Sequence, residues 1–243
     1  MKQKINNSRI KAVLIDSGKV LNGPVTGHWF ITPNFFSFID ENIFKTIDAK
    51  QRNAAFNKAG DYISKQSLII TEEEEFLYFY EYYKLFSNEL PQLKLKDNQI
   101  RAIAEDLVYN YNKYQFYKDS IEVIPELSKK YKLAVVSDAW PSLENVFKRA
   151  GMREYFSSFI ISSIKGITKP DELMYKAALE ELGILPEEAI FIDDSIKNCD
   201  GAAKLGIQSF LMCRDLKSYF YNRLTCKKHS VIRDFYEIKR MLS

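Results

Sequence analysis

The sequence predicts an α/β fold in which a Rossmann-like, mostly parallel sheet forms the core and a helical subdomain is inserted after the first strand. Two observations predict it. Short apolar runs alternate with helical patterns from residue 121 onward, as in βαβ units. The segment 28–117 is mostly helical in pattern and holds more than half of the chain's aromatic side chains. We therefore expect residues 1–24 and 116–243 to form the sheet domain, and residues 25–115 to form a helical subdomain with its own core.

The expected strands are short apolar runs, as is typical of strands buried on both faces of a parallel sheet. The first covers residues 10–16, where Ala-Val-Leu-Ile runs directly into Asp16. The later strands alternate with helices, and a last helix follows the final strand, so a parallel arrangement is expected. The remaining expected strands are residues 133–136, 159–161, 189–192, 209–212 and 230–232, and the helices between them are residues 122–131, 142–150, 170–182 and 198–205.

One helix start in the inserted segment is clear. Thr71 and Glu74 have the spacing of a capping box, ahead of the aromatic run 76–86. The acidic residues 72–75 would lie in the first turn, where they complement the helix dipole, so they need no binding role. We expect the aromatic run to pack in the core of the subdomain rather than to bind a ligand.

The composition is typical of a soluble globular protein. The 243 residues are 46% hydrophobic and 28% charged, and a net charge of +3 without a dense Lys/Arg stripe gives no indication of nucleic-acid binding. The polar N-terminus lacks the apolar centre of a signal peptide, and no apolar run approaches the roughly 20 residues of a membrane span. We therefore expect neither a nucleic acid nor a membrane as partner.

The cysteines are an odd, scattered set, Cys199, Cys213 and Cys226, with no Cys-x-x-Cys pair. This pattern argues against a disulfide framework or a structural zinc site and fits a reducing cytoplasm. We expect Cys199 to be a small packing residue. We also expect residues 217–228 to be solvated surface and His229 to be a surface residue.

Chemistry-bearing side chains follow the expected strands. Asp16, Ser137-Asp138 and Asp193-Asp194 each stand directly after one of them. Ligands of open α/β sheets bind beyond the carboxyl ends of the strands, so we expect these groups to meet. Carboxylates that are crowded into one site need a balancing positive charge. Lys169, just before a predicted helix, and a hard cation such as Mg²⁺ would supply it.

Four segments, in this order, resemble the haloacid dehalogenase (HAD) superfamily: AVLIDSGKVL, LAVVSD, GITKPDELMYKAALEELGI and AIFIDDSIKNCDGAAKLGI. The last two are especially specific, because together they form a long ordered match. The resemblance covers about residues 8–24 and 116–243. The inserted helices match the family's smaller cap type in position and helical character, but not in residues. The resemblance implies a hydrolase core with residues 25–115 as its helical cap.

The resemblance also implies a role for each strand-end residue. Asp16 would be the nucleophile that forms an aspartyl-phosphate. Ser137 would bind the transferring phosphoryl group through its hydroxyl, and Asp138 through its backbone N–H. Lys169 would neutralise the charge of the nucleophile and of the phosphoryl group. Phosphoryl transfer demands mostly positioning and charge stabilisation, and this set would provide both.

The metal that the resemblance implies is Mg²⁺. Its ligands would be Asp16, the backbone carbonyl of Gly18, Asp193 and Asp194. Ser17 and Gly18 would also border the substrate. We expect at least one of the two adjacent aspartates to be a direct ligand, and the alternative for the other is to cap the following helix.

Gly18 departs from the family pattern. Many family phosphatases carry a second Asp two residues after the nucleophile, as general acid/base, and the position four after the nucleophile, often Thr, is Val20 here. The metal site survives the change, because the ligand at Gly18 is its carbonyl. Proton transfer to the leaving group loses its donor, and general acid–base catalysis is worth roughly 10²–10⁴-fold.

His28 is a candidate substitute for the missing donor. It is one of two histidines and lies beside Trp29 just after the first motif, where the chain leaves the predicted core. The hypothesis is that His28 or Trp29 contacts the substrate and that His28 donates the proton; the alternative is a packing or loop histidine. Lys19 could help to bind an anion, or it could simply be solvated.

The interpretation we favour is an Mg²⁺-dependent phosphatase that acts on a small phosphorylated metabolite. Two alternatives stay open. A dehalogenase would use Asp16 as an ester-forming nucleophile on carbon without a metal, and the Asp193-Asp194 pair counts against it. A catalytically weak member would bind a phosphorylated ligand or a protein partner, and Gly18 and Val20 favour that alternative. A phosphomutase is disfavoured, because it too needs the acid that Gly18 lacks.

Overall fold

The computed structural model describes residues 9–243, which divide into two compact units. The sheet unit comprises the described residues up to Gly23, Phe116–Ala139 and Ala150–Ser243. The helical unit comprises Pro24–Gln115 and Trp140–Arg149. Residues 140–149 thus group with the helical unit, whereas the sequence pattern placed them in the sheet domain. No described helix is both long and apolar enough to cross a bilayer.

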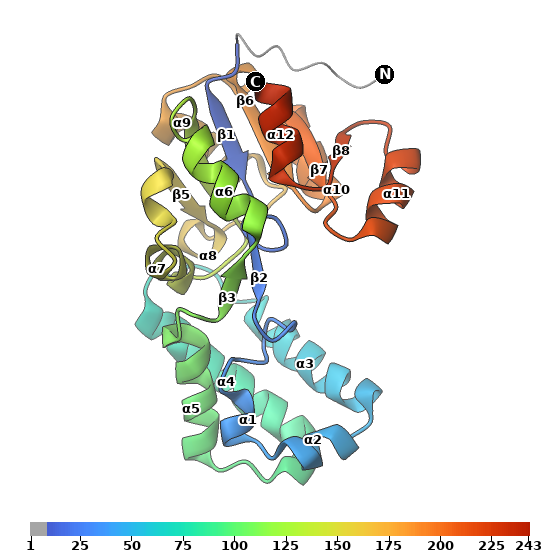
Figure 1. Ribbon diagram of the computed structural model, residues 1–243. Coiled ribbons are helices and arrows are strands. Elements are labelled where there is room, and N and C mark those ends of the chain that lie inside the picture. The colour runs from blue at the N-terminus through green and yellow to red at the C-terminus, as the bar shows by residue number, and fades with distance from the viewer. Residues whose placement is uncertain (1–8) are drawn as a thin grey trace. The chain divides into compact units, whose positions relative to one another are not determined.

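The sheet unit contains six parallel strands in the order β5-β4-β1-β6-β7-β8 (Figure 1). This confirms the predicted α/β class. β1 is a central strand, with Ile15 level with Val135 of β4 on one side and Ile192 of β6 on the other. The carboxyl ends of these three strands therefore lie side by side. The strands are β1 (Ala12–Ile15), β4 (Lys132–Ser137), β5 (Ser158–Ile161), β6 (Ala189–Asp193), β7 (Gln208–Met212) and β8 (Ser230–Ile232).

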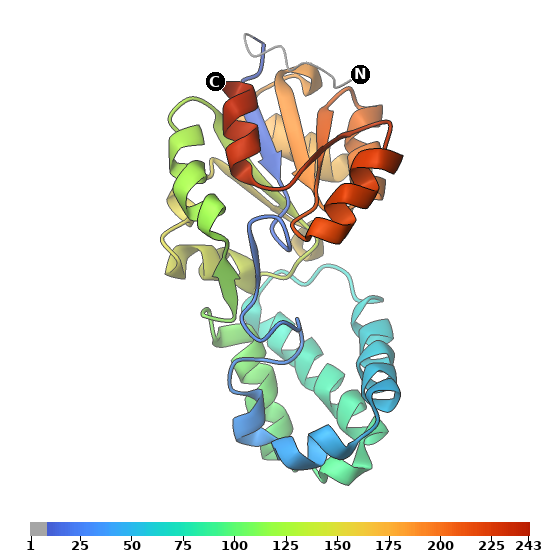
Figure 2. The same cartoon turned by 45° about the vertical axis from the view of Figure 1, so that its right-hand side comes forward.

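Helices cover both faces of this sheet (Figures 1 and 2). Alternate strand residues, such as Leu14 and Phe191, pack with Tyr175 of α9 and Ala202 of α10 in one apolar cluster. On the other face α6 packs beside α12. The helices of the unit are α6 (Lys118–Leu127), α8 (Ser162–Lys165), α9 (Glu172–Leu182), α10 (Ile196–Lys204), α11 (Leu216–Thr225) and α12 (Phe235–Leu242), with short 3₁₀ turns at Arg153–Tyr155 and Pro186–Glu188.

Two features of the C-terminal part differ from the sequence prediction. Residues 217–228, expected as solvated surface, are mostly exposed, but residues 216–225 also form a helix that was not predicted, α11. Asp215 caps its first turn by accepting the Ser218 N–H at 2.8 Å. His229, expected at the surface, is buried, because its Nε2 lies 3.0 Å from Asp200 Oδ1 on α10. Cys199 is buried in an apolar cluster with Leu211, which confirms its expected packing role.

The helical unit is built around aromatic side chains. Phe79 and Phe86, two turns apart on the same face of α4, are fully buried. The ring of Phe86 lies 4.6 Å from that of Phe56 on α3. Thr71 and Glu74 form the predicted capping box at the start of α4. The helices are α1 (Phe35–Phe38), α2 (Glu41–Thr46), α3 (Ala49–Ile63), α4 (Glu72–Glu89), α5 (Asp97–Tyr109) and α7 (Ser142–Arg149), with a 3₁₀ turn at Pro91–Leu93.

A buried polar network holds the start of α7. Glu75 accepts the Ser142 N–H at 2.7 Å and its hydroxyl at 2.6 Å, and Lys113 Nζ donates to Ser142 Oγ at 2.7 Å and to the Leu107 carbonyl at 2.5 Å. Burial raises the pKa of Glu75 and lowers that of Lys113. These contacts with α4 and α5 are the physical reason why α7 groups with the helical unit.

A two-stranded ribbon occurs where the chain leaves and re-enters the sheet unit. It pairs β2 (Asn22–Pro24) with β3 (Tyr114–Phe116). The sequence did not predict it, because each segment has only three residues, too few for a strand periodicity to be recognised.

Candidate active site

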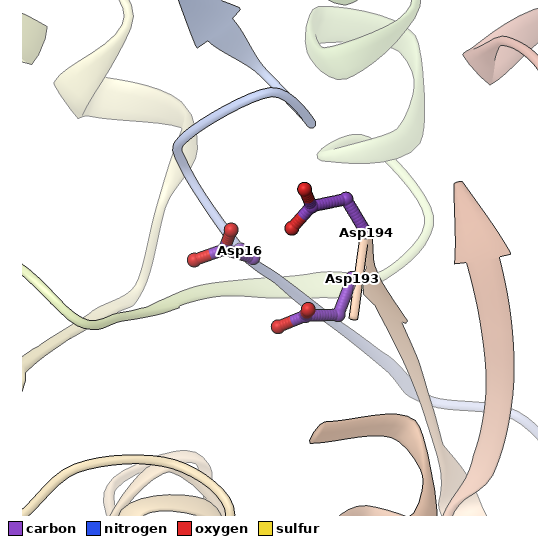
Figure 3. Close-up of side chains that lie close together, drawn as sticks. All are labelled: Asp16, Asp193 and Asp194. Carbon is purple, nitrogen blue, oxygen red and sulfur yellow. The ribbon is translucent and has the colours of Figure 1, made fainter. Parts of the chain in front are cut away.

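Three carboxylates converge at the carboxyl ends of β1 and β6. Asp16 follows β1 directly, and its backbone N–H donates to the Ile192 carbonyl at 2.9 Å. Asp193 is the last residue of β6, and Asp194 follows it. Each carboxylate offers one oxygen, and these three oxygens lie within 4.8 Å of one another. Figure 3 shows the three side chains close together. The adjacent parallel strands bring together side chains that are 177 positions apart, as the sequence predicted.

Lys169 is the cation of this cluster. Its Nζ donates to Asp16 Oδ1 and to Asp193 Oδ2, each at 2.7 Å, and its side chain is only 1% exposed. Burial alone would lower the pKa of Lys169, but the charges of Asp16, Asp193 and Asp138 outweigh that effect and raise it. Lys169 is therefore protonated and binds two carboxylates at once.

Asp138 positions the lysine rather than binding its ammonium group. Asp138 follows β4 and its Oδ1 accepts the backbone N–H of Lys169 at 2.9 Å. This bond fixes the segment that leads into α9. The side chain of Asp138 thus has a contact that the sequence did not predict, since the resemblance implied a role for its backbone only.

The carboxylates carry more negative charge than the nearby lysines offset. Burial raises the pKa of Asp193 to about 7, with the charge of Asp16 as the second cause. Burial and then the charge of Asp16 also raise the pKa of Asp194, whose nearest cation is Lys19 at 3.7 Å. An all-oxygen donor set with excess negative charge is what a hard divalent cation prefers, so these residues fit Mg²⁺.

Asn198, on the first turn of α10, also belongs to this site. Its Nδ2 donates to both oxygens of Asp193, at 3.1 and 3.2 Å, and the Ser195 N–H donates to Asp193 Oδ1 at 2.8 Å. No role was predicted for Asn198. It lies five residues after Asp193, in the first turn of α10. These donors orient the carboxylate and partly satisfy its buried oxygens.

The turn after Asp16 is held by its own hydrogen bonds. Ser17 Oγ accepts from Asn22 Nδ2 at 2.9 Å, and the Lys19 N–H donates to the Asn22 carbonyl at 2.7 Å. Gly18 and Asn22 also form an isolated β-bridge between their backbones. Lys19 has a left-handed φ of 59°, whereas Gly18 does not have a positive φ. Gly18 is therefore not a conformational requirement of this turn.

Ser137 and His28 lie in different units. Ser137 ends β4, two residues beyond the partner of Ile15, so it is buried at the same sheet edge as Asp16. His28 belongs to the helical unit, where its Nδ1 accepts the Phe30 N–H at 3.2 Å and its ring lies 4.5 Å from that of Phe56. Burial lowers the pKa of His28, which favours the neutral ring. These contacts suit a packing residue, and its catalytic role stays a prediction.

Comparisons with known proteins agree with this geometry. The curated phosphoserine phosphatase of Thermus thermophilus is 27% identical over 137 residues, 55% of each chain, and this chain spans about half the length of the curated relatives it matches. The solved L-2-haloacid dehalogenase of Xanthobacter autotrophicus has a TM-score of 0.62 at 17% identity, and the HAD phosphatase of Thermococcus onnurineus 0.59 at 22%. Both alignments cover 96% of this chain and 98% of the other.

A family model also matches the chain directly. The model for haloacid dehalogenase-like hydrolases matches residues 30–206, more than half of the sequence. The match includes Lys169 and Asp193. Asp16 precedes the matched region, and Lys169 Nζ donates to both Asp16 and Asp193. The chain therefore belongs to the haloacid dehalogenase-like hydrolases.

Proposed function

We propose that this hydrolase is an Mg²⁺-dependent phosphatase of a small phosphorylated metabolite. The observation that carries the proposal is the buried Lys169 bridge between Asp16 and Asp193, with Asp194 beside them. This arrangement places one buried positive charge next to a carboxylate at the end of a central strand, and the excess negative charge of the three carboxylates favours a divalent cation beside it. A phosphoryl group, with its negatively charged oxygens, is the substrate group that such a site stabilises best.

The protein groups divide the work of phosphoryl transfer. Lys169 donates to Oδ1 of Asp16, so Oδ2 is the oxygen available to attack phosphorus. Attack forms the bond from Asp16 to phosphorus and breaks the bond from phosphorus to the substrate oxygen, which takes a proton from solvent and leaves as an alcohol. Water then attacks phosphorus, gives a proton to solvent, and releases phosphate while restoring the carboxylate. The Ser137 hydroxyl and the Asp138 N–H are proposed to donate to the phosphoryl oxygens.

Asp16, Asp193, Asp194 and the Gly18 carbonyl are proposed to hold Mg²⁺, which would supply positive charge to the phosphoryl group. The similarity to the phosphoserine phosphatase of Thermus thermophilus supports phosphate esters as the substrate class. Residues 25–115 are proposed to be the cap of this family, and His28 and Ser17 remain proposed substrate contacts.

A panel assay tests this function. We expect the purified chain to release phosphate from at least one small phosphate ester in Mg²⁺ and to lose that activity in EDTA. The control is a parallel panel of 2-haloacids. Halide release in EDTA without phosphate release would contradict the proposal, and so would release of neither product.

A 2-haloacid dehalogenase is the second candidate, and Gly18 is the observation that favours it. A departing halide needs no proton, so a site without a general acid beside the nucleophile suits carbon–halogen cleavage. The similarity to the Xanthobacter dehalogenase fold is consistent with either chemistry. The Asp193–Asp194 pair favours the phosphatase, because the dehalogenase reaction has no use for a cation at that point.

Restoring the missing acid gives a further prediction. Gly18→Asp is expected to raise kcat up to roughly 10²-fold for alkyl phosphates, because their alkoxide leaving group needs a proton. Gly18 lacks a positive φ, so aspartate brings no left-handed strain there. The effect should be small for p-nitrophenyl phosphate, whose phenolate leaves unprotonated. The matched control is Gly18→Asn, which has the same size and no acid. An equal response of both esters, or of both variants, would show that proton donation is not what this position lacks.

A further inference from the structure

A second concave site lies on the sheet unit, beside α10. Its volume is about 1090 Å³, and part of its lining is apolar, from Pro170, Ile196 and Gly201. The carboxylates Asp16, Asp193 and Asp194 do not line it. We call it the α10 hollow. Its volume is slightly larger than the roughly 300–1,000 Å³ that is usual for small-molecule sites.

Helical spacing explains one wall of the α10 hollow. Lys197, Gly201 and Lys204 recur at four- and three-residue intervals, so they share one face of α10. A Cβ at Gly201 would lie 2.6 Å from Pro170 Cβ and 2.8 Å from the Pro170 carbonyl oxygen. Glycine thus lets α10 pack directly on Pro170, which closes the floor of the hollow.

The segment after α11 supplies the opposite wall. Lys227, Lys228 and His229 line the hollow, and the side chain of His229 is only 3% exposed. His229 Nε2 lies 3.0 Å from Asp200 Oδ1, and Lys228 Nζ lies 3.3 Å from the same oxygen. These two contacts attach the segment 227–229 to α10, so the two sets of lining residues are held together by direct interactions.

The charge of the α10 hollow is strongly positive. Four lysines line it, and Asp200 is the carboxylate among the lining residues. Asp200 is already engaged by Lys228 and His229. Within the described part of the chain, neither Lys197 nor Lys204 has a carboxylate oxygen within 4.0 Å of its Nζ, although the charge of Lys197 acts on Asp138. Lys227 Nζ donates to the Leu224 carbonyl at 2.9 Å. Ammonium groups that converge on a concave surface attract anions.

We propose that the α10 hollow binds a small molecule that carries a polyphosphate chain. Lys197 and Lys204 are seven residues apart, hence about 10 Å along the helix axis, so a single orthophosphate contacts both ammonium groups only if both side chains bend toward it. A chain of several phosphates can lie between them while Lys227 contacts it from the other wall. The apolar floor at Ile196 and Pro170 has room for a base or another flat group. The hollow adjoins the Asp16 site, since Pro170 follows Lys169 and Lys197 precedes Asn198, but Asp16, Asp193 and Asp194 do not line it. The proposal does not depend on the reaction proposed at Asp16.

Calorimetry on the full chain tests this site, with EDTA present and 0.15 M NaCl. Inorganic triphosphate and ATP are the probes, and we expect saturable one-to-one binding of at least one of them with Kd below about 1 mM. Tighter binding of ATP would identify a nucleotide, and equal binding would identify the bare phosphate chain. Lys204→Ala/Lys227→Ala should weaken binding about tenfold.

Two controls keep the result specific. Lys129→Ala/Lys130→Ala removes the same charge from exposed positions outside the hollow and should leave Kd unchanged. Lys204→Arg/Lys227→Arg should retain binding and show that the variants fold. Hydrolysis of phosphate esters should be unaffected in all three variants. No saturation with either probe, or equal weakening by both alanine pairs, would overturn the proposal. A single-stranded oligonucleotide that binds more tightly with the same lysine dependence would overturn it too.

Discussion

Asp16→Asn is expected to lower kcat for phosphate-ester hydrolysis by at least about 10³-fold, because an amide oxygen cannot form the acyl-phosphate. The substitution keeps the size of a side chain that is 11% exposed, so the fold should tolerate it. Lys169 keeps its contact with Asp193 in this variant. The loss should therefore appear in kcat, measured by phosphate release under saturating Mg²⁺ and substrate.

A second measurement distinguishes loss of the nucleophile from general damage to the site. The charge of Asp16 is one cause of the raised pKa of Asp193. Removing that charge should lower the pKa of Asp193, which ¹³C NMR of the carboxyl carbon can follow in the metal-free protein. The matched control is Glu180→Gln on the exposed side of α9, which should change neither quantity. Activity within tenfold of the wild type in Asp16→Asn would rule out Asp16 as the nucleophile.

Lys169→Met is expected to lower both activity and stability. The ammonium group is buried between two carboxylates, and removing it leaves Asp16 and Asp193 without their cation. Breaking a buried ion pair on one side costs about 3–5 kcal/mol of the free energy of unfolding. Activity should fall by at least about 10³-fold, because the phosphoryl charge loses its fixed partner. Urea unfolding in EDTA and phosphate release in Mg²⁺ measure the two effects.

The stability loss in Lys169→Met should depend on pH. In the folded state burial raises the pKa of Asp193 to about 7, against about 3.9 for an unfolded aspartate. A folded-state pKa above the unfolded one means that stability falls as pH rises between those two values. Loss of Lys169 raises the folded-state pKa further, so the variant should lose more stability at pH 8 than at pH 5.

A matched lysine separates this effect from a general change in charge. Lys176→Met removes a lysine from α9, where Nζ contacts Glu172 Oε1 at 2.6 Å with both side chains well exposed. That variant should lose less than about 1 kcal/mol at either pH. Equal losses in the two variants, or a loss in Lys169→Met that is independent of pH, would contradict the buried-cluster interpretation.

Much of the sheet unit could be predicted because its strands are buried on both faces. Such strands are nearly continuous apolar runs, and alternation with helices leaves few arrangements open. For the same reason Asp16 and Asp193-Asp194 stood out, as carboxylates directly after apolar runs. The order of motifs then indicated the family, and the match over residues 30–206 confirms it.

The features that were missed depend on contacts between distant residues. α11 has a polar sequence with exposed apolar side chains and so lacks a clear helical stripe. His229 is buried, and its ring contacts Asp200, a residue 29 positions earlier in the chain. α7 belongs with the helical unit because Glu75, 67 residues earlier, accepts hydrogen bonds from Ser142. No periodicity in the sequence reports such partners.

The sequence by itself determined the fold class, the strand ends and the residue types of the site, because these follow from local apolar patterns and motif order. It also determined that Gly18 stands where a family acid is common. Only the tertiary structure decided that Lys169 bridges Asp16 and Asp193, that Asn198 holds Asp193, and that α10 and the 227–229 segment enclose a basic hollow. Those relations depend on three-dimensional distances between residues far apart in the chain, which packing sets and sequence spacing does not.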